Sequence, residues 1–350
     1  MSTLELLSVM LIVIATAITA VLVTVGVSSL ARAHRVRLEP SLDDARHAIV
    51  KALSGGIAES NDAVAVLGRF SRRHVTSVML ELAPSVNGTS RSVLVNLGDR
   101  TGVLPSARGG LRRRRWSTRL YSIRVLAAFG VETEEMRRLL ADRSSHVRAQ
   151  AAAWAVVAPS AEVLAGLIDL LSDPDGLCRF AAQDALVRIG LAGSEALITA
   201  LDTADDDVVR RILEVAAAMG DERFCDIAMG LSVHSTPETR ALAGAVLART
   251  GSPNAGPALV GMLNDSSEDV IRVAVVGIAK LSYWPGGAAV EPLLGHPSWE
   301  LRKQAGLTLL ALGAPGEILL RSAAPGDDLA AEMAVRALQL QSISPQEAFA

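Results

Sequence analysis

The chain has 350 residues, of which half are hydrophobic, only 3% are aromatic and two are cysteine. This composition suits close packing of alanine- and leucine-rich helices, fits a β-sandwich poorly and excludes a disulfide framework. The formal charge of −3 is unevenly spread, because residues 1–130 hold 17 basic and 8 acidic side chains, whereas residues 131–350 hold 17 and 29. A basic first part and an acidic remainder predict different neighbours for each, and the acidic remainder repels nucleic acid.

An uncharged apolar segment of 26 residues runs from 6 to 31. It is long enough to span a bilayer, which takes roughly 20 residues. The short tail 1–5 has no basic residue, whereas Arg32, Arg35 and Arg37 follow the segment in the linker 32–40. The positive-inside rule therefore predicts a single-pass signal-anchor in the cytoplasmic (inner) membrane, with the N-terminus outside and the body in the cytoplasm. A cleaved signal peptide is the alternative, but it needs a basic n-region and an apolar core of roughly 7–15 residues.

Residues 41–70 are predicted to form N-terminal helices, the first capped by Ser41. Beyond them, four consecutive arginines precede a tryptophan: Arg112, Arg113, Arg114, Arg115 and Trp116. Arginines clustered near a membrane attract anionic lipid headgroups, at roughly 1 kcal/mol per charge, and would attract an acidic protein partner in the same way. The alternatives are a solvated helix face with Trp116 in the core, and a contact with nucleic-acid phosphate. The run is therefore a candidate membrane- or partner-binding site.

An arginine recurs every 30 to 32 residues through the second half of the chain, at Arg148, Arg179, Arg210, Arg240, Arg272 and Arg302. Each opens an alanine-rich segment with apolar or small residues one before, three after and seven after the arginine. Those offsets share one face of a helix. Glycines ten or eleven residues after four of the arginines predict left-handed helix ends, at Gly190, Gly220, Gly251 and Gly313. Self-similarity at this period is typical of stacked repeats.

A shorter apolar segment and a polar turn precede each arginine, so each repeat is predicted to be two antiparallel helices. The spacing extends upstream to Arg119 and Arg91 and downstream to Glu332. We expect about nine helix pairs over residues 71–341, followed by a C-terminal tail at 342–350. The predicted fold is therefore all-α: an α-solenoid of helix pairs preceded by one transmembrane helix.

Three aromatic residues fall in one repeat of this aromatic-poor chain: Tyr283, Trp284 and Trp299. Tryptophan and tyrosine anchor many protein interfaces, so these residues form a second candidate partner-binding site. The alternative is packing in the core between repeats.

The sequence shows no catalytic, cofactor-binding or metal-binding constellation. None of the six histidines has another histidine or a cysteine at ligand spacing on one helix. The acidic runs 205–207 and 327–328 fall at turns or helix starts, where carboxylates cap helices. The glycine-rich phosphate loop and the serine nucleophile elbow are both missing from the sequence. We therefore expect no cofactor and no enzymatic activity.

Helix pairs of about 31 residues, with an aspartate in the turn and an arginine opening the second helix, resemble short HEAT repeats of the phycobilisome (PBS)-lyase-like kind. The residues that match are Asp142 with Arg148, Asp173 with Arg179, and Asp265 with Arg272. The resemblance implies an armadillo-like superhelix in which aspartates and arginines of this kind, with Arg210, Arg240 and Arg302, form a structural ladder between stacked repeats. The pattern departs at Ser232 and His296, where the aspartate is missing.

The whole plan is similar to bacterial membrane-anchored HEAT-repeat proteins, some of which accompany membrane glycosyltransferases of polysaccharide assembly. This resemblance implies a membrane-tethered cytoplasmic scaffold or adaptor, which binds membrane-associated protein partners on its repeat surface. The alternative is an enzyme of a related helical-repeat class, either a bilin lyase or a DNA-base-excision enzyme. A bilin lyase gains nothing from a membrane anchor, and the net negative charge of the repeats opposes DNA binding.

Overall fold

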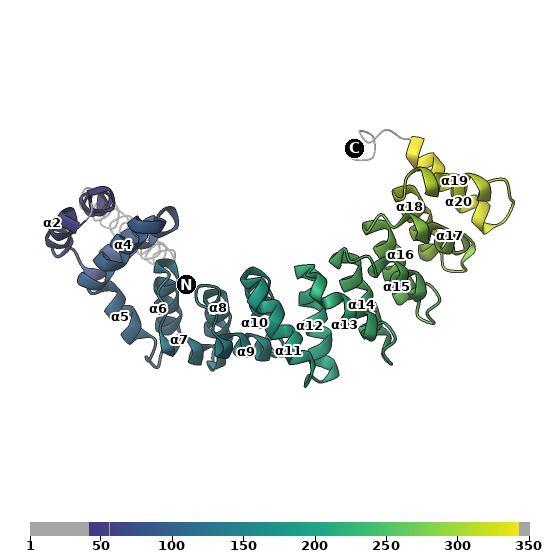
Figure 1. The fold of residues 1–350 in the computed structure, drawn as a ribbon. Coiled ribbons are helices and arrows are strands. Elements are labelled where there is room, and N and C mark those ends of the chain that lie inside the picture. The colour runs from purple at the N-terminus through teal and green to yellow at the C-terminus, as the bar shows by residue number, and fades with distance from the viewer. Residues whose placement is uncertain (1–41, 56, 343–350) are drawn as a thin grey trace, which may run out of the picture. The chain divides into compact units, whose positions relative to one another are not determined.

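The computed structural model describes residues 42–55 and 57–342, and every regular element in this part of the chain is a helix (Figure 1). The all-α prediction is therefore confirmed for the described residues. The predicted membrane-spanning segment 6–31 lies outside them, as do the flanking segments 1–5 and 32–40 and residues 343–350 of the predicted tail. Within the described part, no helix combines the length and the apolar character needed to cross a bilayer.

Tertiary contacts divide the chain into two compact units, with the boundary between Thr133 and Glu134. The helices of the first unit are residues 42–55, α2 (Ile57–Leu67), α3 (Arg72–Leu82), η1 (Ala83–Ser85), α4 (Gly88–Arg100), α5 (Val103–Gly110) and α6 (Trp116–Phe129). Their apolar sides form the core of this unit, whose most buried large side chains include Ile49, Leu67, Met79, Leu97, Leu126 and Phe129.

In the second unit each repeat has a shorter first helix and a longer second helix. The first helices are α7 (Glu134–Arg138) with η2 (Leu139–Ala141), α9 (Ala161–Leu170), α11 (Leu191–Leu201), η3 (Glu222–Phe224) with α13 (Cys225–Leu231), α15 (Ala255–Met262), η4 (Trp284–Gly286) with α17 (Gly287–Val290) and η5 (Glu291–Gly295), and α19 (Ala314–Ala323). The second helices are α8 (Ser145–Ala155), α10 (Gly176–Ile189), α12 (Asp206–Met219), α14 (Pro237–Thr250), α16 (Glu268–Lys280), α18 (Trp299–Ala311) and α20 (Leu329–Ser342). Consecutive second helices contact one another, so they form one continuous layer (Figure 1).

The face predicted around each repeating arginine is the face that the second helices bury. The residues three positions after the arginines are all fully buried: Ala151, Ala182, Leu213, Ala243, Val275 and Ala305. Small residues bring neighbouring helices close, since a Cβ added to Gly277 would lie 2.8 Å from Leu259 Cδ1 and 3.0 Å from Ala248 Cβ. Burial of this apolar seam, at roughly 25 cal/mol per Å², stabilises each repeat against its neighbours.

The four glycines predicted to end second helices all have positive φ, from 65° to 71°. Gly220 adopts the left-handed conformation and its N–H donates to the Ala216 carbonyl, which closes the end of α12. Gly190 and Gly313 differ, because their ψ values of −121° and −143° turn the chain directly into α11 and α19, whose first turns are bonded to the carbonyls of these glycines. The predicted helix stop is therefore present, but at these two glycines it also starts the next helix without a loop.

Carboxylates cap the helix starts as predicted for the two acidic runs. Asp205 is the N-cap of α12, and its side chain accepts the N–H of Val208 at 2.9 Å, while the next two acids lie in the first turn. Near the start of α20, Asp328 accepts the N–H of Ala331 at 2.8 Å. These carboxylates satisfy backbone donors that have no partner inside the helix.

Candidate functional site

Most of the repeating arginines make the same contact with the turn that precedes their own helix. The guanidinium Nη1 donates to the carbonyls six and five residues earlier, at distances of 2.7 to 3.1 Å. This contact is made by Arg179, Arg240 and Arg302, and Arg148 makes its first half, to the Asp142 carbonyl at 2.8 Å. In the first unit Arg119 does the same with the carbonyls of Arg113 and Arg114. The repeating arginine therefore ties the interhelical turn to the start of the second helix.

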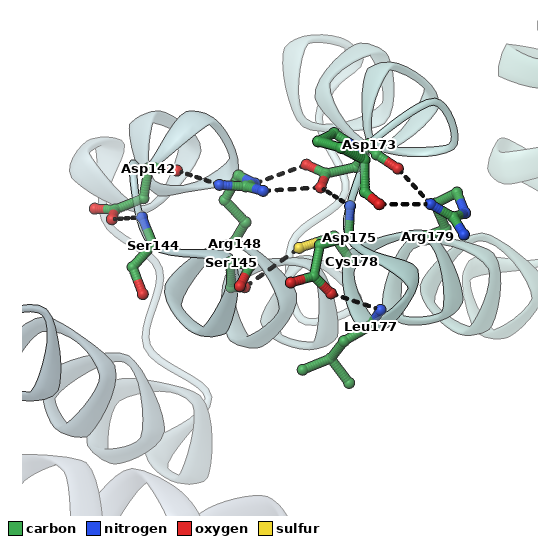
Figure 2. Close-up of polar contacts among 10 residues, drawn as sticks. Asp142, Ser144, Ser145, Arg148, Asp173, Asp175, Leu177, Cys178 and Arg179 are labelled. Atoms are coloured by element: carbon green, nitrogen blue, oxygen red, sulfur yellow. Dashed lines mark hydrogen bonds and ion pairs between the residues drawn. The ribbon is translucent and has the colours of Figure 1, made fainter.

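Two of these arginines, Arg148 and Arg240, also bind an aspartate of the next repeat. Arg148 Nε and Nη2 donate to the two carboxylate oxygens of Asp173 at 2.7 and 2.8 Å, a bidentate pair shown in Figure 2. The side chains of Arg148 and Asp173 are only 16% and 7% exposed. Asp173 Oδ1 also accepts the backbone N–H of Asp175 at 2.9 Å. Burial alone would raise the pKa of Asp173, but the hydrogen bonds from Arg148 and from the Asp175 backbone outweigh it and hold that pKa below its ordinary value.

We call such an arginine–aspartate pair between repeats a rung, and a second rung joins two repeats further along the chain. Arg240 Nε and Nη2 donate to the Asp265 carboxylate, both at 2.7 Å, and Asp265 Oδ1 accepts the N–H of Ser267 at 2.8 Å. The hydrogen bond from Arg240 lowers the pKa of Asp265, against the opposing effect of burial. In both rungs the aspartate lies 25 residues after the arginine, so each rung connects one repeat to the next.

Three other arginines lack a carboxylate at the equivalent place. The residue 25 after Arg179 is Ala204. Asp173 lies six residues before Arg179, and the corresponding positions before Arg240 and Arg302 hold His234 and His296. The residue that replaces the aspartate is therefore His234, and not Ser232. Arg210 and Arg272 instead pair with an exposed aspartate three residues earlier in their own helices, Asp207 and Asp269. Among these repeats the ladder therefore has two rungs, Arg148–Asp173 and Arg240–Asp265, whereas Arg210 and Arg272 pair within their own helices.

The two histidines take over the local role of the aspartate. The Nδ1 atom of His234 accepts the backbone N–H of Thr236 at 3.2 Å, and that of His296 accepts the N–H of Ser298 at 3.1 Å. These bonds match the one that Asp173 makes to the backbone two residues on. An imidazole can thus hold the turn, but it offers no carboxylate to the arginine of the preceding repeat.

Cys178 makes a further contact between α10 and α8 beside the rung of Arg148 and Asp173. The residue is fully buried, and its thiol donates to the Ser145 carbonyl at 3.3 Å, which links α10 to the first turn of α8 (Figure 2). Burial raises the pKa of the Cys178 thiol, which keeps it protonated near neutral pH. Both cysteines, Cys178 and Cys225, are buried free thiols.

The arginine run lies in the turn between α5 and α6 of the first unit rather than along a helix face. The side chains of Arg112, Arg113, Arg114 and Arg115 are all exposed. Trp116 is the first residue of α6 and is 46% exposed, so it is not a core residue. The run is accessible to a ligand or a partner.

The structure does not give the three aromatic candidates one role. Tyr283 packs within its unit, because its ring occupies the space in which a Cβ on Gly256 would lie, 2.6 Å from Tyr283 Cγ. Trp284 is 64% exposed at the start of η4. Trp299, the first residue of α18, is 49% exposed and lines a surface groove that includes neither of the other two.

The groove lies between α18 and α20, which contact each other directly. Its volume is about 340 Å³, and it is lined by Trp299, Lys303, Leu307, Met333, Arg336, Ala337, Gln339 and Leu340. Leu307 and Leu340 are 37% and 54% exposed. Lys303 Nζ lies 5.2 Å from the centre of the Trp299 ring, within reach of a cation–π contact. The sequence held a signal for Leu307, because it follows the buried Ala305 by two residues, about 200° around a helix, where a polar residue is expected.

No group of three or more histidine, cysteine, aspartate or glutamate side chains is placed to hold a metal ion within the described part of the chain.

Comparison with known proteins agrees with this architecture. The sequence profile of HEAT repeats matches residues 194–279. Comparison with curated proteins finds no match. Among solved structures, the chain is similar to the complex of CpcE and CpcF of phycocyanin lyase from Nostoc sp. PCC7120, with 21% identity, a TM-score of 0.31, and coverage of 68% of this chain and 93% of that one.

Two further structures extend the comparison. A designed armadillo repeat protein has 20% identity and a TM-score of 0.32, with coverage of 60% of this chain and 100% of that chain. The Kap95p chain in a complex with RanGDP has 13% identity and a TM-score of 0.48, with coverage of 83% of this chain and 49% of that chain. At these identities and TM-scores the structural similarities identify no activity and no partner. The described chain is an all-helical repeat protein, and residues 194–279 match the HEAT-repeat profile.

Proposed function

We propose that this protein is a non-enzymatic scaffold that binds a partner protein on its repeat surface. We propose further that a membrane-spanning segment tethers the repeats to the cytoplasmic side of the membrane. The observation that carries this proposal is the apolar groove between α18 and α20. Stacked helix pairs present extended surfaces on which partners bind, and exposed apolar grooves with aromatic anchors are typical of such sites.

The occupant that fits this groove is an amphipathic helix with acidic residues beside its apolar face. The exposed apolar side chains of Trp299, Leu307 and Leu340 supply the contact area. Both charged residues that line the groove, Lys303 and Arg336, are basic; Arg336 pairs with Glu332 of its own helix at 2.6 Å, so Lys303 contributes most of the positive charge. An apolar channel with basic edges favours a helix whose apolar residues recur at i, i+3, i+4 and i+7 and whose flanks are acidic.

A direct test uses a fluorescent helical peptide with leucines at those positions and glutamates on the flanks, titrated into the full-length chain by anisotropy. Truncating a tryptophan that anchors an interface costs 2 kcal/mol or more, so Trp299→Ala should weaken binding by roughly 30-fold. Trp284→Ala is the matched control, because Trp284 is 64% exposed and lies outside the groove. A lysine-flanked peptide should bind more weakly than the glutamate-flanked one. Equal effects of the two tryptophan variants, or a preference for the lysine-flanked peptide, would exclude the groove as this site.

The tether is the apolar segment 6–31, followed by the basic linker 32–40. Confinement to the membrane raises the effective concentration of the groove for membrane-associated partners, without any new contact. The resemblance to membrane-anchored repeat proteins makes the cytoplasmic domain of a membrane glycosyltransferase the first partner to examine. Cell fractionation of the full chain and of residues 32–350 tests the tether: we expect only the full chain in the membrane fraction. If both forms sedimented with membranes and kept the same partners, the segment would not be the tether.

A further inference from the structure

A second pocket lies in the first unit, where α3, α5 and α6 converge. Its volume is about 530 Å³, within the usual range for small-molecule sites. The residues that line it include two arginines and four serines or threonines, from the three helices and from the turn between α5 and α6: Arg72, Arg113, Thr76, Ser106, Thr118 and Ser122. Its wall also includes Tyr121 and two glycines at the end of α5. The groups that converge here come from segments up to fifty residues apart in the sequence, so only folding assembles them.

The charge of this pocket is entirely positive. Arg72 and Arg113 are exposed toward solvent, and no acidic side chain lines the pocket. The nearby carboxylate of Asp99 is already bound to Arg108 at 2.9 Å. Among the described residues, no ion pair involves Arg72 or Arg113. Two guanidinium groups that share a pocket without a counter-ion repel each other, and an anion between them would remove that repulsion.

The hydroxyl groups add polar atoms at the same place, although that of Thr76 already donates to the Arg72 carbonyl at 2.8 Å. Ser122 is only 3% exposed, yet it lines the pocket, and the hydrogen bonds of the described residues include none from its hydroxyl. Ser122 lies over Gly110, where an added Cβ would collide with Ser122 Oγ, so a glycine is needed for α5 to approach α6. The Ser122 hydroxyl is therefore a buried polar group that faces the pocket and is available to donate to a bound oxygen.

Helix ends reinforce the positive potential. Arg72 is the first residue of α3, and Thr118 lies in the first turn of α6, so the pocket adjoins two helix N-termini, whose dipoles favour anions. The C-terminus of α5, whose dipole disfavours anions, also adjoins the pocket. However, the carbonyls of Arg108 and Gly110 accept the N–H groups of Leu111 and Arg113. Their lone pairs are thus partly used, and they oppose an anion less than free carbonyls would.

We propose that this pocket is a binding site for a phosphomonoester group. A phosphate dianion presents several acceptor oxygens in a compact tetrahedron, and it matches two arginine side chains and hydroxyl groups that line one pocket. Arg113 belongs to the exposed arginine run, whereas Arg72, Thr118 and Ser122 do not, so the site differs from the run in composition and depth. Either a soluble metabolite or a lipid headgroup can supply the phosphate, because the pocket would bind the same group in both.

The test is calorimetric titration of the full-length chain, held in neutral detergent at physiological salt. The probes are glycerol 3-phosphate for the soluble source and dihexanoyl phosphatidic acid for the headgroup source. We expect at least one of them to bind, with Arg113→Gln and Arg72→Gln each weakening it about tenfold or more and Ser122→Ala weakening it severalfold. Arg114→Gln is the control, because it removes the same charge from the same turn but lies outside the pocket.

The outcomes distinguish a soluble ligand from a lipid headgroup, and they also decide whether the site exists. Binding of glycerol 3-phosphate that acyl chains do not improve indicates a soluble ligand, and tighter binding of the phosphatidic acid indicates a headgroup; either result supports the site. No binding of either probe overturns it. Equal losses in Arg113→Gln and Arg114→Gln also overturn it, because they would show attraction to the whole basic run rather than recognition in a pocket.

Discussion

The rung between Arg148 and Asp173 makes a quantitative prediction about stability. Asn at position 173 keeps the size of the side chain and the oxygen that accepts the Asp175 N–H, but it removes the charge that binds Arg148. Breaking a fully buried pair costs about 3–5 kcal/mol. Because the Arg148 side chain is 16% exposed and one neutral hydrogen bond remains, we expect Asp173→Asn to lower the free energy of unfolding by about 2–3 kcal/mol. In a unit of this size that is a fall in Tm of about 4–12 °C.

Trp154 is a suitable reporter for this measurement. It lies in α8, the helix of Arg148, and is 1% exposed, whereas the other three tryptophans are at least 46% exposed. Urea unfolding followed by its fluorescence gives the loss of stability near the rung. The control is Asp269→Asn, which removes the partner of Arg272 from a pair whose side chains are 45% and 77% exposed and which should therefore contribute little. A loss in Asp173→Asn no larger than in this control would refute the reasoning.

The pH dependence of the same variant gives a second check. The pKa of Asp173 is lower in the folded protein than its ordinary value, which is about 3.9 in an unfolded chain. The carboxylate therefore stabilises the fold fully above about pH 4, and this contribution is lost as the pH falls through the folded-state pKa. The difference in unfolding free energy between wild type and Asp173→Asn should be constant near neutral pH and shrink below about pH 4. A difference that persists unchanged at pH 2 would mean that the charge is not its source.

Two further predictions concern the other repeats. Ala204→Asp places a carboxylate 25 residues after Arg179 and should close a third rung, raising the urea midpoint with a gain of about 1 kcal/mol; a lower midpoint would show that this interface cannot accept the carboxylate. Arg302→Gln removes hydrogen bonds to two turn carbonyls and should destabilise by about 1–2 kcal/mol, whereas Arg272→Gln removes only an exposed pair; equal thermal shifts in these two variants would contradict the turn-tying role.

Much of the repeat architecture follows from spacing alone. The arginine interval, the buried position three residues later and the glycine helix stops are all local consequences of a helix of 3.6 residues per turn. The predicted buried face is confirmed at all six residues three after the arginines, but Val209, Ala217 and Ala279 at the other offsets are partly exposed. Those exceptions lie in α12 and α16, where the arginine bonds to its own helix instead of to the preceding turn.

The candidate sites were less accessible from the sequence. Pairing each arginine with the nearest preceding aspartate matched Asp142 with Arg148, yet the side chain of Arg148 binds Asp173 in the next repeat and only the backbone of Asp142. The groove and the phosphate pocket need tertiary placement, because their side chains come from different helices. Leu307 is the exception, since an apolar residue opposite a buried face is visible in the sequence.

The turn contact explains why the arginine recurs at four of the six repeats while the aspartate varies, whereas Arg210 and Arg272 pair within their own helices. The contact between Arg302 and the turn carbonyls is complete within one repeat, so it needs no particular residue in the neighbour. A rung needs both an arginine and a carboxylate in the following repeat, and that carboxylate must give up water to enter the interface. Where His296 stands at the carboxylate position, the imidazole holds its own turn and the interface avoids that cost. The arginine therefore defines the repeat, while the residue opposite it decides, one interface at a time, whether two repeats are joined by charge or by apolar packing alone.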